Sequence, residues 1–190
     1  ILKAGTHKVR VRFVPTDVVS YEAVEVEKSV VVTPSKVRVI AQDASRDYGA
    51  QNPAFTYRIE GFYLEPDLDE LTATFVLSTS ANQESVAAQY DIEVTGNYAA
   101  GDYEIEYVAG KLTVKKVSPT IEWDIPEFIT YGTTLSEIFT AKGSSPGSSD
   151  ELDGKYTYIP GGDEILSAGT HKIRVRFVPT DVVSYKASEV

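Results

Sequence analysis

The chain offers few side chains of the types that carry out acid–base or nucleophilic chemistry. It contains two histidines and no cysteine in 190 residues. His7 and His171 occupy the same position in two copies of one repeated segment, so each copy has a single imidazole. A serine or threonine nucleophile needs a nearby base, usually histidine, and a zinc site needs several converging ligands. The sequence therefore predicts a protein that is not an enzyme, with no catalytic residues, no metal ligands and no bound cofactor.

Two acidic clusters are candidates for binding a cation. They are Glu65, Asp67, Asp69 and Glu70, and Asp150, Glu151 and Asp153. Carboxylate oxygens suit Ca²⁺, but neither cluster has the ordered ligand spacing and central glycine of an EF-hand loop. We interpret both clusters as solvated surface loops, and weak calcium binding at them stays open as the alternative.

A basic ladder alternates with apolar residues and occurs twice. Its members are Lys8, Arg10 and Arg12 in one copy and Lys172, Arg174 and Arg176 in the other. Alternation of this kind places the charges on the outer face of a strand, with Ile173, Val175 and Phe177 on the inner face. We expect the charges to pair with glutamates on the neighbouring strand, and attraction of an acidic glycan is the alternative.

Trp123 is the single tryptophan of the chain. It alternates with Ile121 and Ile125, which predicts a strand whose tryptophan lies in the core between two sheets. An exposed platform on which a sugar could stack is the alternative.

The composition limits the partners. The net charge of −10 argues against nucleic acid, because phosphate binding requires a basic surface. No apolar run reaches the roughly 18 residues that a membrane-spanning helix requires. Valine, threonine and tyrosine are abundant, and these residues favour strands.

The long internal repeat indicates how the domains are organised. Residues 1–26 recur as residues 165–190, and the four differences are Lys3/Ser167, Val9/Ile173, Glu22/Lys186 and Val24/Ser188. A spacing of 164 residues suits a unit of one or two whole domains. We therefore expect the chain to be a window on a tandem array within a longer protein.

Alternating apolar residues predict strands along the whole chain. Residues 103–116 read as a hairpin that turns at Ala109-Gly110. Residues 30–32 form a strongly β-forming run that ends at Pro34. We see no apolar period of a helix over ten or more residues.

Several motifs in the central region share the spacing of a known family. They are Tyr48-Gly49, Asn52-Pro53, Tyr57, Gly61, Gly96, Asn97, Tyr98, Tyr107, Gly110, Leu112 and Val114. On these residues the region resembles the MBG repeat of the Tyr-Gly-X type, found in large bacterial surface proteins. Ala88 stands where that family usually has a glycine.

The last third resembles bacterial immunoglobulin-like surface repeats. The likeness is carried by Trp123, Tyr131-Gly132, Leu135, Tyr158, Pro160-Gly161, Gly169, Phe177, Pro179 and Tyr185. Together the two resemblances imply an extracellular repeat region at a bacterial cell surface, in an adhesin or another envelope protein. Neither resemblance implies particular binding residues.

These observations predict an all-β chain of tandem antiparallel β-sandwich modules. We interpret residues 1–34 as the C-terminal strands of a preceding immunoglobulin-like repeat, residues 35–116 as an MBG-type domain, and residues 117–190 as an immunoglobulin-like domain lacking its final strand.

The leading functional hypothesis is a semi-rigid stalk or spacer, and the alternative is an adhesive module that binds a glycan, mucin or host protein. The expected partners are neighbouring repeats of the same chain. We also expect residues 27–34 to supply a missing strand, either head to tail between molecules or within one chain.

Overall fold

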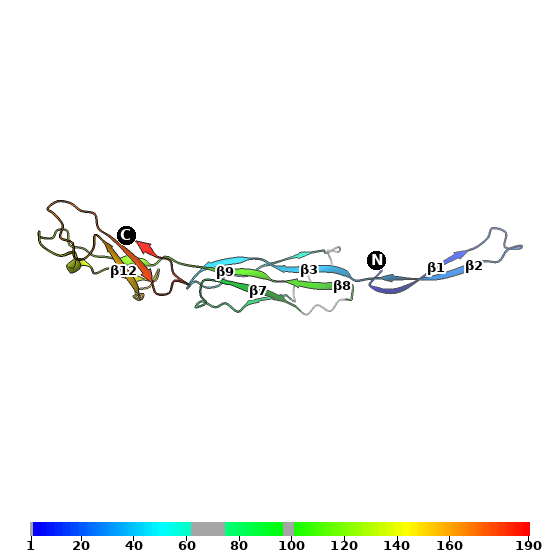
Figure 1. Ribbon diagram of the computed structural model, residues 1–190. Coiled ribbons are helices and arrows are strands. Elements are labelled where there is room, and N and C mark those ends of the chain that lie inside the picture. Colours follow the sequence, from blue (N-terminus) through cyan, green and yellow to red (C-terminus); the bar gives the residue numbers. More distant parts are fainter. Residues whose placement is uncertain (1, 62–74, 97–100) are drawn as a thin grey trace. The chain divides into compact units, whose positions relative to one another are not determined.

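The computed structural model describes residues 2–61, 75–96 and 101–190 of the chain (Figure 1). Over these residues the structure consists of strands and one 3₁₀ turn, η2 (Leu135–Ile138), and it contains no α-helix. The predicted all-β class is therefore confirmed. The chain divides into two compact units. The first takes Ile1–Asp43, Ala54–Thr79 and Asp91–Lys111, and the second takes Ala44–Pro53, Ser80–Tyr90 and Leu112–Val190.

The first unit begins with a two-stranded antiparallel hairpin. Its strands are β1 (Gly5–Phe13) and β2 (Val24–Val32), paired from Gly5↔Val32 to Phe13↔Val24. The predicted β-forming run at residues 30–32 lies in β2. Nearly every residue of both strands is exposed to solvent.

Three further strands of the first unit form a sheet of order β5-β3-β8. They are β3 (Ser35–Ala41), β5 (Tyr57–Glu60) and β8 (Tyr103–Val108). β3 pairs antiparallel with β5 and parallel with β8, and its alternate residues Val37 and Val39 are fully buried. This is the inward alternation that a strand with one covered face requires.

A four-stranded sheet has the order β4-β9-β7-β6. Its strands are β4 (Ala44–Asp47), β9 (Gly110–Lys115), β7 (Gln89–Thr95) and β6 (Val76–Thr79). β6 and β7 are antiparallel, whereas β4 and β9 are parallel. Ile92 and Leu112 provide fully buried side chains of its core.

Two expectations about strand pairing are corrected. β8 and β9 do not form the expected hairpin, because β8 belongs to one sheet and β9 to the other. The chain continues past Ala109-Gly110 without reversing, and a Cβ on Gly110 would lie 2.6 Å from the Ala41 carbonyl oxygen. Glycine here serves a close approach of two backbones and not a turn. The pairings β3–β8 and β4–β9 are also parallel, which the long connection between each pair permits.

The remaining strands of the second unit form two small sheets. One pairs β10 (Thr120–Glu122) with β11 (Lys142–Ser144), and the other has the order β12-β13-β14. These last strands are β12 (Gly154–Ile159), β13 (Arg174–Pro179) and β14 (Ser188–Glu189). Val175 and Phe177 of β13 are fully buried, as the alternation predicted. The Phe177 ring stacks on Tyr156 with a centroid distance of 4.6 Å.

Asp181 closes the turn after β13. Its Oδ1 accepts hydrogen bonds from the backbone N–H groups of Val183 and Ser184, both at 3.0 Å. Asp17 makes the same turn after β1, at 3.0 Å and 3.1 Å to Val19 and Ser20. The backbone N–H of Ser184 is the main cause that holds the pKa of Asp181 below its ordinary value.

This lowered pKa predicts an acid-sensitive second unit. The Asp181 carboxylate stabilises the fold above its unfolded-state pKa, and this contribution is lost as pH falls through its lower folded-state pKa. Asp181→Asn is therefore expected to lower the free energy of unfolding of the second unit by at most about 1 kcal/mol at neutral pH, since the group is exposed. The loss is expected to be smaller at low pH. Trp123 fluorescence during urea unfolding at several pH values measures this. Asp17→Asn is the matched control, because Asp17 lies in the first unit and Trp123 in the second. An equal loss of stability of the second unit in both variants would contradict the prediction.

Candidate functional site

The residues that could bind a metal do not converge. His7 Nε2 lies 2.6 Å from the Lys3 carbonyl oxygen, and His171 Nε2 lies 2.8 Å from that of Ser167. Among the residues that the structure describes, no group of three or more His, Asp or Glu side chains could hold a metal ion. The cluster of Glu65, Asp67, Asp69 and Glu70 lies outside the described residues.

The second acidic cluster makes separate local contacts. Asp150 accepts a hydrogen bond from Ser148 Oγ at 3.0 Å, and Glu151 lies 3.7 Å from Lys142 Nζ. Asp153 contributes its carbonyl oxygen, which accepts the N–H of Thr180 at 2.8 Å. These contacts agree with the interpretation as surface loops. Calcium binding at either cluster stays an untested alternative.

The basic ladder pairs with glutamates as expected. Glu27 lies 2.8 Å from Lys8 Nζ and 2.6 Å from Arg10 Nε, and these two cations hold the pKa of Glu27 below its ordinary value. Arg174 Nη1 lies 3.5 Å from Glu189 Oε1. The prediction of cross-strand ion pairing is confirmed at Lys8, Arg10 and Arg174.

Trp123 is half-buried and lies just beyond the end of β10, which is shorter than the predicted strand. Its ring packs edge-on against Tyr158 at 5.5 Å, and its Nε1 donates a hydrogen bond to the Ile138 carbonyl at 3.1 Å. Ile125, expected on the same inner face, is exposed. Trp123 thus packs within the second unit, although less deeply than predicted.

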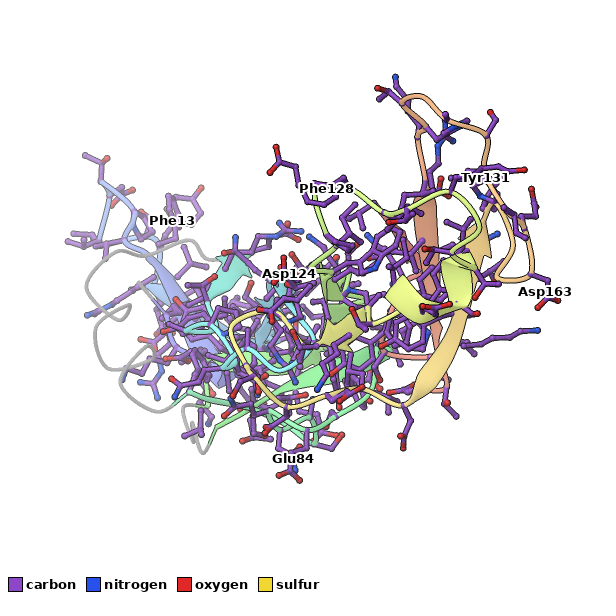
Figure 2. All side chains as sticks on the ribbon, turned by 90° about the vertical axis from the view of Figure 1, so that its left-hand side faces the viewer. Phe13, Glu84, Asp124, Phe128, Tyr131 and Asp163 are labelled. Atoms are coloured by element: carbon purple, nitrogen blue, oxygen red, sulfur yellow. The ribbon has the colours of Figure 1, made fainter. Side chains whose placement is uncertain are left out.

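An open pocket of about 510 Å³ lies in the second unit. It is bounded by residues 125–138 and 166–173. Phe128 and Tyr131, on the loop that follows β10, line it and are 84% and 77% exposed (Figure 2). Exposed aromatic rings beside a concavity could stack against a sugar. Sequence alone does not identify this pair, because a loop has no periodicity that distinguishes exposed rings from buried ones.

Two parallel strand pairs, the ladders β3–β8 and β4–β9, have the same offset between paired residues. β3 pairs with β8 from Ser35↔Tyr103 to Ile40↔Val108, and β4 pairs with β9 from Ala44↔Leu112 to Asp47↔Lys115. The partners are 68 positions apart in both ladders. The Lys111 N–H also donates to Asp43 Oδ1 at 2.7 Å, with the same separation of 68 positions. Residues 35–47 therefore run beside residues 103–115 in one direction and in one register.

A buried arginine organises the loop after β4. The Arg46 side chain donates from Nε to Asn52 Oδ1 at 2.6 Å, and further to the carbonyl oxygens of Asp47 and Asn82. Asn52 Nδ2 in turn donates to the Ala81 carbonyl at 2.7 Å. Gly49 has a φ of +81°, a conformation that disfavours other residues. These contacts give physical roles to the Gly and Asn of the motif at residues 48–53.

No helix among the described residues is long and apolar enough to cross a membrane. No curated protein and no solved structure matches the chain. A family model, described as MBG domain (YGX type), matches residues 37–113. The match covers most of β3, all of β4 to β8 and most of β9, and it includes Arg46, Gly49 and Asn52 of the loop network. Residues 37–113 of the chain are therefore an MBG domain of the YGX type.

Proposed function

We propose that the chain is a non-catalytic repeat segment of a bacterial cell-surface protein, acting outside the cell as a semi-rigid stalk. The MBG domain indicates a repeat module of a surface protein. The long sequence repeat is in keeping with a tandem array. The observation that carries the mechanical role is the single register of the two parallel ladders.

The direction of these ladders decides how they respond to tension. Tension along the chain pulls residue 35 toward the N-terminus and residue 115 toward the C-terminus. Because residues 35–47 and 103–115 are parallel, this tension slides one segment along the other. The hydrogen bonds of the ladder then carry the force together, whereas separation from one end would break them one by one.

Short joints support the semi-rigid character. Two residues separate β2 from β3, and four separate β9 from β10. Pro34 lies in the first joint and Pro119 in the second, and proline restricts backbone rotation. Connections of this length leave little room for a flexible linker.

Single-molecule pulling of the chain by its two ends tests the mechanical role. We expect the MBG domain to resist and then unfold in one step, since its hydrogen bonds fail together. Fully extended, residues 35–115 would span up to about 280 Å, at roughly 3.5 Å for each of the 81 residues, and the gain in length is this span minus the folded separation of residues 35 and 115. A gradual extension of the chain, without one force peak followed by the release of this length, would contradict the proposal.

The exposed aromatic pair supports a second candidate function. Phe128 and Tyr131 beside the open pocket would suit an adhesive module that binds a glycan, mucin or host protein. Binding of the chain to a panel of glycans and mucins tests this idea. Saturable binding that falls at least about tenfold in Phe128→Ala/Tyr131→Ala, a loss of roughly 1.4 kcal/mol, would favour adhesion. Tyr21→Ala, which removes an exposed ring elsewhere, is the control, and no saturable binding would argue against adhesion.

A further inference from the structure

The hairpin β1–β2 has two different faces. Side chains on one face form the ion pairs of Lys8 and Arg10 with Glu25 and Glu27. The opposite face, here called the apolar hairpin face, carries Val9, Val11, Phe13, Val24, Val26 and Val30, together with His7 and Lys28. All six apolar residues are exposed, and Phe13 has 66% of its surface accessible. Several exposed apolar side chains on one face mark an interaction surface more often than an isolated apolar residue does.

The same hairpin occurs a second time in the chain, where it is covered. β13 and β14 pair as Arg176↔Glu189 and Phe177↔Ser188. The equivalent pairs in β1 and β2 are Arg12↔Glu25 and Phe13↔Val24, each 164 positions earlier. Val175 and Phe177 are 0% exposed, whereas their counterparts Val11 and Phe13 are 65% and 66% exposed.

The segment that covers the second copy is visible in detail. β12 pairs with β13 from Gly154↔Pro179 to Ile159↔Arg174. Gly143 and Gly154 leave room for the Phe177 ring, since a Cβ at either position would lie about 2.5 Å or less from it. Val117 donates its N–H to the Ser184 carbonyl at 3.1 Å and accepts the Lys186 N–H at 2.8 Å. All these contacts come from residues 117–159.

The four sequence differences between the copies leave this contact surface almost unchanged. Val11, Phe13, Pro15 and Ser20 are identical to Val175, Phe177, Pro179 and Ser184. Of the differing positions, Ser188 donates a side-chain hydrogen bond to the covering segment, from Oγ to the Pro119 carbonyl at 2.9 Å, and Val24 replaces it in the first copy. Within the described residues, β1 pairs with β2 alone, so its second edge corresponds to the edge of β13 that holds β12.

We propose that the apolar hairpin face docks onto a segment with the sequence of residues 117–164, supplied by an adjoining repeat of the same polypeptide. The hairpin then closes an immunoglobulin-like module that spans two repeats. Phe13 takes the place that Phe177 has against Tyr156, and β1 gains a β12-like strand along its second edge. The module boundary thus lies inside the sequence repeat, and each repeat is interlocked with the next by a buried core.

The test is a chain in which residues 117–164 are joined directly to Ile1, which reproduces the natural junction of Glu164 with Ile165. We expect the amide hydrogens of residues 10–14 to exchange at least about 100-fold more slowly than in the 190-residue chain, because β1 becomes a central strand. Phe13→Asp in the extended chain is expected to abolish this protection. Val31→Asp, on the charged face of the same hairpin, is expected to leave it intact.

Two results would overturn the proposal. One is exchange at residues 10–14 that is equally fast in the extended and the 190-residue chains. The other is protection that appears in the 190-residue chain as its concentration rises and is lost in Phe13→Asp, since the occupant would then be a second copy of the chain. Sedimentation velocity on both chains distinguishes these cases, because the docked extended chain is expected to remain monomeric.

Discussion

Phe177→Ala is expected to destabilise the second unit by about 3–5 kcal/mol. The ring is completely buried, stacks on Tyr156, and fills the space that Gly143 and Gly154 leave open. Its removal deletes that burial and leaves a cavity among rigid strands. The fluorescence of Trp123, the single tryptophan, reports the loss during urea unfolding, since Trp123 packs against Tyr158 in the same unit.

Phe13→Ala provides a control with the same local sequence. Phe13 is mostly exposed, so its replacement is expected to change the free energy of unfolding of the 190-residue chain by less than about 0.5 kcal/mol. The contrast isolates the effect of burial, because both phenylalanines occupy the same position of the same 26-residue segment. Equal effects of the two variants would show that Phe177 does not anchor the core.

Arg46→Ala is expected to lower the free energy of unfolding of the MBG domain by about 2–3 kcal/mol. Arg46 is only 6% exposed, and its guanidinium satisfies Asn52 Oδ1 and two backbone carbonyls. The variant removes these hydrogen bonds, including the one to the half-buried Asn52, together with a side chain that is itself buried. Hydrogen exchange of the β4 and β7 amides measures the loss locally.

Arg38→Ala is the matched control for the buried arginine. Arg38 lies on β3 and forms exposed ion pairs with Glu60 at 3.5 Å and Glu106 at 3.3 Å. Exposed ion pairs contribute little, so we expect a change of less than about 1 kcal/mol. If Arg38→Ala destabilised the domain as much as Arg46→Ala, burial would not be the reason for the role of Arg46.

Sequence periodicity predicted the parts of the fold that depend on neighbouring residues. The inward positions of Val175 and Phe177 and the outward charges of the basic ladder follow from a period of two. Periodicity does not tell whether a strand turns back or continues into another sheet. For this reason the alternation over residues 103–116 predicts a hairpin, whereas Ala109-Gly110 is a crossing point between sheets.

The candidate sites depended on long-range pairing, which one sequence does not reveal. The common separation of 68 positions in β3–β8 and β4–β9 follows from packing between segments far apart in the chain. Arg46 was not identified either, because an arginine next to Asp47 reads as an exposed charge. Its burial depends on Asn82, 36 positions away. In contrast, the sequence repeat identified the hairpin pair directly, since residues 1–26 and 165–190 can be aligned by eye.

The mechanical claim is tested most directly by pulling the MBG domain in two directions. The chain lacks cysteine, so cysteines introduced at residues 35 and 115 give one pair of handles, and cysteines at residues 35 and 103 give another. The first pair slides the parallel strands along each other, and the second separates β3 from β8 at the Ser35↔Tyr103 end. We predict a clearly higher unfolding force for the first pair at equal pulling speed. Equal forces in the two directions would contradict a stalk that owes its strength to the parallel register.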